Sequence, residues 1–397
     1  MIRIEAGRGR VSRTKEAARA SWFLILALMM AAIVQPAAAQ TFTVLHEFQG
    51  APNDGSGPRG GLLRDGAGNF FGTTFGGGGD SEGAIYKLTP NGQESVLFAF
   101  NTSDGSFPTS GLVRDKAGNL YGTADEGPGG AGVLFRLAKD GAEATFHAFQ
   151  GGQNSEAAVP SGGVIIDAAG NFYGATLLGG LGFGTIYQVD PAGNLKVLYN
   201  FQGRADGASP QGPLVRDSAG NIFGAAAEKG AHNAGTIFKL APNGTLTVLH
   251  SFTGARDGKT PQGGLLLDAA GNLFGSAFGG GDTGNGTIFQ VSKNGGFRRL
   301  HSFSGAVDGT NPNGALIRDS DGNIFGAAQL GGTFSLGTVF KLTPAGQLTV
   351  LHNFTGDEDG ATPFSGLLRD ASGNLFGTAE QNFLIDQRGG TVFKITP

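Results

Sequence analysis

Short apolar runs alternate with turns rich in Asp, Gly and Asn throughout residues 40–397. In one representative stretch, the apolar runs 264–267 and 273–276 flank such a turn. Two further runs, 286–291 and 299–303, flank a turn that contains Asn294-Gly295. Short runs rich in β-branched and aromatic residues, bounded by these turn residues, predict β-hairpins. Helix-length runs with a 3.6-residue period are missing, so the pattern predicts an all-β protein.

One phrase, Gly-Asn-apolar-(Phe or Tyr)-Gly, recurs seven times at intervals of 50 to 52 residues. A fixed period of this size indicates a repeat architecture. Each unit holds four short strands, here called A to D, with tight A–B and C–D turns and longer B–C and D–A loops, which is typical of a propeller blade. The asparagines of the phrase are Asn69, Asn119, Asn171, Asn221, Asn272, Asn323 and Asn374.

The two ends of the repeat region complement each other. The segment 43–48 reads as a lone strand D, and the chain ends with strands A, B and C at 366–370, 374–377 and 390–395. Pairing the first strand with the last three completes the seventh unit and leaves no open sheet edge. We therefore predict a seven-bladed β-propeller of four-stranded blades that fills residues 40–397 as a single domain.

Two aromatic series and one aspartate series follow the repeat. A phenylalanine ends every strand D and an aromatic residue stands in every strand B, so we expect both series in the core. An aspartate begins every A–B turn, where its side chain can accept hydrogen bonds from the backbone. The strand D series is Phe48, Phe100, Phe149, Phe201, Phe252, Phe303 and Phe354. The turn series is Asp65, Asp115, Asp167, Asp217, Asp268, Asp319 and Asp370.

Residues 1–39 lie outside the repeat. Six basic residues precede an apolar run at 22–34, and Pro36 to Ala39 offer an A-x-A cleavage site. These three parts are typical of a secretory signal peptide, and the apolar run is short for a membrane span. We expect cleavage after Ala39 and a secreted or periplasmic protein without a membrane span.

The remaining chain carries 22 basic and 30 acidic residues, a formal charge of −8. An acidic domain without a basic run is a poor partner for nucleic acid or anionic lipid. Cysteine is absent, so the fold must be stable without disulfides. No motif for catalysis or for phosphate binding appears in its required setting, so we assign no catalytic residues and expect no metal, no cofactor and a monomer.

Five of the six histidines share one position of strand D, where two other repeats have Phe98 and Tyr199. Replacement by aromatic residues indicates that ring shape, and not a proton or a metal, is needed there. The sixth histidine, His232, lies in a B–C loop beside Glu228.

An acidic residue stands four positions before the proline of every D–A loop. Asp-Gly turns ahead of a proline explain the series as turn chemistry. Alternatively, side chains that point to the axis would form a ring of negative charge that attracts a cation or a cationic ligand. The series is Asp54, Asp104, Glu156, Asp206, Asp257, Asp308 and Asp359.

The D–A and B–C loops of a propeller lie on one face, and variable loops on a rigid ring are where a binding site is expected. We therefore predict a secreted binding or interaction module whose ligand is a glycan, a peptide or a protein. An alternative is a propeller-type lyase or hydrolase that uses His232 with Glu228, and a third is a structural surface protein. Besides the acidic series, the candidate ligand-binding residues are Asp125, Glu126, Glu228, His232 and Glu380.

The repeats, such as 367–378 with its Asp-Ala-Ser-Gly-Asn turn and 337–344, resemble the GloVer tandem repeats of secreted bacterial proteins, named from Gloeobacter and Verrucomicrobia. This resemblance covers residues 40–397 and implies no activity that could be carried onto residues here. The Asp-x-x-Gly-Asn turn also resembles that of NHL propellers.

Overall fold

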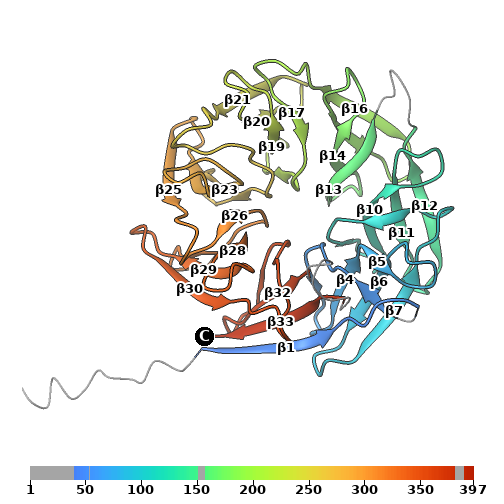
Figure 1. Cartoon of the computed structure of the whole chain (residues 1–397). Coiled ribbons are helices and arrows are strands. Elements are labelled where there is room, and N and C mark those ends of the chain that lie inside the picture. Colours follow the sequence, from blue (N-terminus) through green and yellow to red (C-terminus); the bar gives the residue numbers. More distant parts are fainter. Residues whose placement is uncertain (1–39, 53, 151–156, 381–388) are drawn as a thin grey trace, which may run out of the picture. The chain divides into compact units, whose positions relative to one another are not determined.

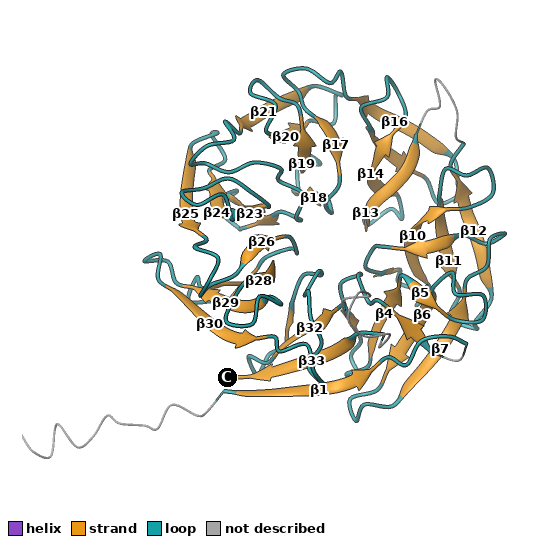
Figure 2. Cartoon of the chain, viewed as in Figure 1, coloured by secondary structure: helices purple, strands orange, loops and turns teal. Residues whose placement is uncertain are grey.

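The computed structural model describes residues 40–52, 54–150, 157–380 and 389–397. All regular structure in these residues is β-strand (Figure 2). The chain divides into one unit of Met1–Thr41 with Pro397, and a second unit of Phe42–Thr396, which is described below. The predicted signal peptide lies outside the described residues. Within the described part, no helix has the length and apolar character that crossing a membrane requires.

The unit Phe42–Thr396 is built from seven sheets of four or five strands, arranged around a central axis (Figure 1). The predicted seven-bladed propeller is confirmed. Blade 1 contains β3 (Leu63–Arg64), β4 (Phe70–Thr74), β6 (Ala84–Leu88) and β7 (Glu94–Ala99), beside the small ladder of β2 (Gly55–Ser56) and β5 (Gly76–Gly77). Blade 2 contains β8 (Ser106–Pro108), β9 (Val113–Arg114), β10 (Leu120–Glu126), β11 (Val133–Leu137) and β12 (Glu143–Ala148). Blade 3 contains β13 (Ala158–Ile166), β14 (Phe172–Leu178), β15 (Thr185–Val189) and β16 (Leu195–Asn200).

The remaining blades repeat this order. Blade 4 contains β17 (Ala208–Pro210), β18 (Val215–Arg216), β19 (Ile222–Glu228), β20 (Thr236–Leu240) and β21 (Leu246–Ser251). Blade 5 contains β22 (Leu266–Leu267), β23 (Leu273–Ala277), β24 (Thr287–Val291) and β25 (Phe297–Ser302). Blade 6 contains β26 (Thr310–Pro312), β27 (Ile317–Arg318), β28 (Ile324–Leu330), β29 (Thr338–Leu342) and β30 (Leu348–Asn353). Blade 7 contains β31 (Leu368–Arg369), β32 (Leu375–Ala379), β33 (Thr391–Thr396) and β1 (Thr41–Glu47).

Blade 7 joins distant parts of the chain, because its sheet order is β1-β33-β32-β31. Beyond the end of β1, the backbone N–H of Phe48 donates to the carbonyl of Gly390 at 2.9 Å, and the N–H of Gly389 donates to the carbonyl of Phe48 at 2.9 Å. Figure 1 shows β1 and β33 side by side. The first strand therefore has the place that strand D has in the other blades.

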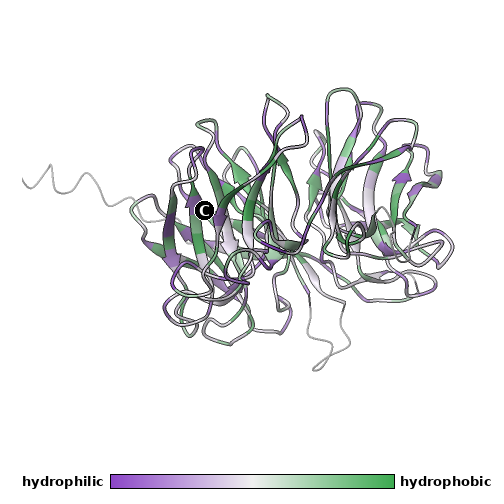
Figure 3. Cartoon of the chain, turned by 90° about the horizontal axis from the view of Figure 1, so that it is seen from above, coloured by the Kyte–Doolittle hydropathy of each residue, from purple (hydrophilic) through white to green (hydrophobic). Residues whose placement is uncertain are grey.

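The core lies between blades. Phe303 ends strand D of blade 5 and is fully buried against Phe340 of strand C in blade 6, with ring centroids 5.3 Å apart. Each of the seven strand D phenylalanines makes the same edge-to-face contact with the next blade, including Phe48 of blade 7 with Tyr86 of blade 1. The hydrophobic positions follow the strands in Figure 3. The predicted core position of the strand D phenylalanines is confirmed.

The asparagine of the repeat phrase closes the A–B turn through hydrogen bonds to the turn aspartate. The Oδ1 atom of Asp268 accepts the backbone N–H of Asn272 at 2.8 Å, and the Asn272 amide donates to Oδ2 of Asp268 at 3.0 Å. The same pair of bonds is present in all seven turns. The predicted structural role of the turn aspartates is confirmed.

The glycine that ends the repeat phrase is required by side-chain packing. Gly275 lies opposite Phe289 in the pairing of β23 with β24. A Cβ atom added at Gly275 would lie 2.7 Å from Cζ of Phe289. The aromatic side chain of strand C thus lies flat across the glycine of strand B, and any larger residue there would push it out.

Candidate functional site

Strand A is interrupted near the axis in blades 2, 4 and 6. In blade 2, β8 and β9 both pair with β10, and the residues from Thr109 to Leu112 between them leave the ladder. Blades 4 and 6 have the same interruption, between β17 and β18 and between β26 and β27. In blade 3, β13 is continuous and instead shifts register between Ser161 and Val164.

The D–A proline is held by the preceding blade. In blade 6, the backbone N–H of Asn311 donates to the carbonyl of Asn285 in blade 5 at 2.9 Å. Pro312 then packs on Gly286, where an added Cβ would lie 2.5 Å from the proline Cδ. Asn311 has φ = 58°, a conformation that costs a non-glycine residue free energy. The axis residue that follows is therefore positioned by two blades at once.

A cavity of about 510 Å³ lies on the axis. Every blade contributes to its wall the residue that directly follows the D–A proline. The seven side chains are three amides, two hydroxyls, one guanidinium and one aromatic ring. They are Arg59, Thr109, Ser161, Gln211, Gln262, Asn313 and Phe364, which we call the axial ring.

Arg59 is the only charged member of the axial ring, and its charge is compensated. Its Nη2 and Nε atoms donate to Oε1 of Glu380 at 2.7 and 3.0 Å. The guanidinium carbon lies 3.9 Å from the ring centroid of Phe75 and 6.0 Å from that of Phe364. These contacts hold the guanidinium in one orientation.

Asp125 supports the neighbouring member of the axial ring. The hydroxyl of Thr109 donates to Oδ1 of Asp125 at 2.9 Å. Burial raises the pKa of Asp125, against the hydrogen bond from Thr109 and the positive charge of Arg59. Two residues predicted from the sequence, Asp125 and Glu380, therefore contact the axial ring.

The acidic D–A series lies elsewhere. Oδ1 of Asp308 accepts hydrogen bonds from the backbone N–H and the hydroxyl of Ser304, at 2.9 and 2.6 Å, within its own loop. Burial alone would raise the pKa of Asp308, but hydrogen bonds from His301 and Ser304 outweigh it and lower the pKa to about 2. The described members, which do not line the axial cavity, are Asp54, Asp104, Asp206, Asp257, Asp308 and Asp359. Glu156 lies outside the described residues.

The expectation that strand D histidines supply only ring shape is wrong. The Nε2 atom of His301 lies 2.8 Å from Oδ2 of Asp308 in a hydrogen bond. His250 and His352 bond to the loop aspartates of their own blades at 3.1 and 2.9 Å. The hydroxyl of Tyr199, which replaces histidine in one blade, donates to Asp206 at 3.0 Å. In these four blades the two residues are seven positions apart, and this shared spacing was the signal for the pairing.

The remaining loop candidates lie apart from the axial ring. Glu126 and Glu228 are exposed at the ends of β10 and β19, and His232 is exposed in the following loop of blade 4. For the residues that the structure describes, no hydrogen bond or ion pair joins His232 to Glu228. The acid–base pair of the enzyme alternative therefore lacks the contact it requires.

Two glutamates at the start of strand D are partly buried. Burial raises the pKa of Glu94 to about 7, where the negative charge of Asp54 acts in the same direction and His46 opposes it. Burial likewise raises the pKa of Glu143 to about 7, with a contribution from the charge of Asp104.

Sequence reasoning missed the axial ring. Six different residue types occupy the seven positions after the D–A prolines, while glycine or serine always follows them. A variable residue between a constant proline and a constant small residue could have indicated a binding position. Only the folded ring shows that the seven variable residues line one cavity.

Solved structures with the same fold include the extracellular domain of a proposed one-component system of B. thetaiotaomicron. It shares 14% identity at a TM-score of 0.56, over 89% of this chain, and this chain spans 42% of it. A proposed 6-phosphogluconolactonase of Bacteroides uniformis shares 17% identity at a TM-score of 0.50, over 73% of this chain and 83% of its own. At these identities the likeness shows the fold alone.

A search of curated proteins found no match. The Gloeobacter/Verrucomicrobia repeat matches residues 32–158, 130–305 and 245–397, which together include all the described blades. The matched residues share the repeat phrase, the hydrogen bonds of the A–B turn and the glycine that contacts the strand C ring. The chain belongs to the Gloeobacter/Verrucomicrobia repeat family.

Proposed function

We propose that the protein is an exported binding module that holds a polar, uncharged ligand, of the glycan class, in the axial cavity. The observation that carries the proposal is the axial ring. One position of the repeat supplies seven side chains to a single cavity, and those side chains differ between blades although the frame around them is constant.

The chemistry of the axial ring suits hydroxyl groups. The amides of Gln211, Gln262 and Asn313 each offer donors and an acceptor. The hydroxyls of Thr109 and Ser161 already donate to Asp125 and to the carbonyl of Pro210, so they offer acceptors. Such groups match a ligand whose hydroxyls also donate and accept. Phe364 adds an apolar face of the kind on which a sugar ring can lie.

Charge favours a neutral ligand. The guanidinium of Arg59 already pairs with Glu380, so an anion would have to compete with that carboxylate. The acidic surplus of the chain also opposes nucleic acid and anionic lipid.

Export rests on the basic residues, the apolar run and the A-x-A site within residues 1–39. It agrees with the extracellular placement of a protein that shares the fold. The exported chain would begin at Gln40, which N-terminal sequencing of protein recovered outside the cytoplasm would test.

Binding is tested with the purified protein on an array of glycans and peptides. We expect glycans to bind, and we expect Gln262→Ala and Asn313→Ala each to weaken binding about tenfold, because each removes hydrogen bonds in a confined site. His232→Ala and Glu228→Ala serve as controls on the exposed rim and should leave binding unchanged.

Three outcomes would contradict the proposal. They are glycan binding that survives both axial substitutions, binding that is lost in the rim variants, and an array on which only peptides bind.

A further inference from the structure

In two blades, the aromatic residue six positions before the strand D phenylalanine stacks on the strand D histidine of the preceding blade. Phe297 stacks on His250 with centroids 3.9 Å apart and planes 15° apart, and Phe42 stacks on His352 at 3.7 Å and 11°. Apolar residues occupy this position in five blades, where they are partly buried. They are Phe42, Leu195, Leu246, Phe297 and Leu348.

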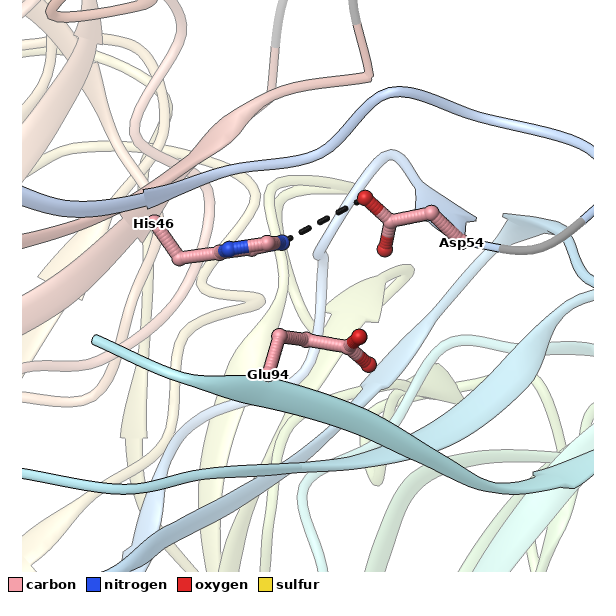
Figure 4. Close-up of side chains that lie close together, drawn as sticks. All are labelled: His46, Asp54 and Glu94. Carbon is pink, nitrogen blue, oxygen red and sulfur yellow. Dashed lines mark ion pairs between the residues drawn. The ribbon is translucent and has the colours of Figure 1, made fainter.

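Blade 1 differs where it packs on blade 7, because Glu94 stands at the position that is apolar in five other blades. Its side chain lies near His46. Nε2 of His46 lies 3.4 Å from Oδ2 of Asp54. One ligand atom from each of His46, Asp54 and Glu94 lies within 4.8 Å of the other two. Figure 4 shows the His46 imidazole from β1 and the Asp54 carboxylate from the following loop pointing toward each other, with the Glu94 carboxylate from β7 below them.

Asp54 accepts backbone hydrogen bonds from Gln49 and Gly55 at 2.8 and 2.7 Å, whereas His46 and Glu94 each have a buried atom without a partner among the described residues. Nε2 of His46 and Oε1 of Glu94 are buried and make no hydrogen bond with a described residue. The His46 and Asp54 side chains are only 17% and 13% exposed. In the blades of His250, His301 and His352 the corresponding distance to aspartate is 2.8 to 3.1 Å, shorter than at His46. Buried polar atoms of this kind call for another partner.

Blade 2 provides a natural comparison. Glu143 occupies the same position as Glu94, but the residue of blade 1 that it would cover is Phe98, and Asp104 is the nearby acid. This second site has two carboxylates and no imidazole. Only at the junction of blades 7 and 1 do a histidine and two carboxylates come together in the described part of the chain.

We propose that His46, Asp54 and Glu94 bind one divalent transition-metal ion, with Zn²⁺ as the representative, which ties β1 to β7. Imidazole nitrogen suits Zn²⁺, Ni²⁺ and related ions, whereas Ca²⁺ and Mg²⁺ prefer oxygen ligands alone. Two carboxylates neutralise the two positive charges. The three ligand atoms lie within 4.8 Å of one another, and side-chain rotation would have to bring each to roughly 2.0–2.2 Å from the Zn²⁺ ion, with a fourth position open to water.

The test is thermal unfolding of the tag-free protein after chelation, with Zn²⁺, Ni²⁺, Ca²⁺ or Mg²⁺ added singly. Because an ion that binds only the folded state raises Tm, saturating Zn²⁺ should raise it by at least about 2 °C. Calorimetric titration should give one Zn²⁺ per chain, and Ca²⁺ and Mg²⁺ should give no comparable shift.

Two variants copy residues that other blades already carry, so both are expected to fold. Glu94→Leu and His46→Phe should each abolish the rise with Zn²⁺, and Glu94→Leu without metal should unfold at or above the wild-type temperature. Glu143→Leu is the matched control and should keep the full response.

The proposal is overturned if Zn²⁺ leaves the wild-type Tm unchanged, if Glu94→Leu or His46→Phe keeps the response, or if Glu143→Leu loses it. Because the axial cavity is separate from these three residues, glycan binding should be the same in all the variants.

Discussion

Three positions along strand D make different contacts. The residue six positions before the buried phenylalanine packs on the preceding blade, and the residue two positions before it bonds to the loop aspartate. In blade 5 these are Phe297, His301 and Phe303. Because strand D is the outermost strand, all three close the outer edge of the blade against water.

Phe303→Ala should lower the free energy of unfolding by about 3–5 kcal/mol, since it removes a fully buried ring that packs on Phe340. Chemical denaturation followed by circular dichroism measures the change. A loss below about 1 kcal/mol would show that the contact between the blades is not part of the core.

Asp308 should make stability depend on acid. Its pKa is about 2 in the folded protein and near 3.8 ordinarily, so its contribution is fully present above pH 4 and is lost as pH falls toward 2. After allowance for solvent screening, we expect a contribution of about 1 kcal/mol. Unfolding curves of wild type and Asp308→Asn should converge between pH 4 and pH 2. A difference that stays constant with pH would contradict this assignment.

At the scale of elements, the hairpins combine a hydrogen-bonded turn with a glycine that accommodates an aromatic ring. The bonds between Asp268 and Asn272 set the A–B turn, and Gly275 leaves space for Phe289. Both features are local to one blade, which explains why the repeat phrase can recur with the same residues.

Gly275→Ala should destabilise the protein by about 1–3 kcal/mol, because the added methyl group would lie 2.7 Å from the ring of Phe289. Gly66→Ala is the matched control, since an added Cβ there has nothing within 4 Å. Thermal unfolding of both variants measures the difference. Equal melting temperatures would show that the ring does not need the glycine.

At the scale of the whole propeller unit, the contact between blades 7 and 1 repeats the contacts between the other blades. Pro58 packs on Gly390, where an added Cβ would lie 2.6 Å from the proline Cδ, as Pro312 packs on Gly286 at 2.5 Å. Phe48 meets Tyr86 at 4.9 Å, as Phe303 meets Phe340. The junction formed by the two ends of the chain therefore has the packing of an ordinary interface between blades.

Gly390→Ala and Gly286→Ala should consequently cost similar amounts, each about 2–4 kcal/mol, because both glycines have positive φ and both would clash with proline. Chemical denaturation measures both. If Gly286→Ala destabilises and Gly390→Ala does not, the ring is open at this junction in solution.

The sequence by itself determined the strands, the seven units and the buried aromatic positions. These depend on interactions within one repeat, such as Asp268 with Asn272, so a constant period is enough to reveal them. It also marked Asp125 and Glu380 as loop residues of interest, without their partners Thr109 and Arg59.

Which side chains of neighbouring blades meet, and what lines the axis, became visible only in the folded ring. Gln262 and Asn313 reach one cavity, and Glu94 covers His46, because packed and twisted blades bring positions from different repeats together. The repeat period does not report the angle at which neighbouring blades pack. Contacts within a blade can therefore be predicted from the sequence, whereas side-chain contacts between blades cannot.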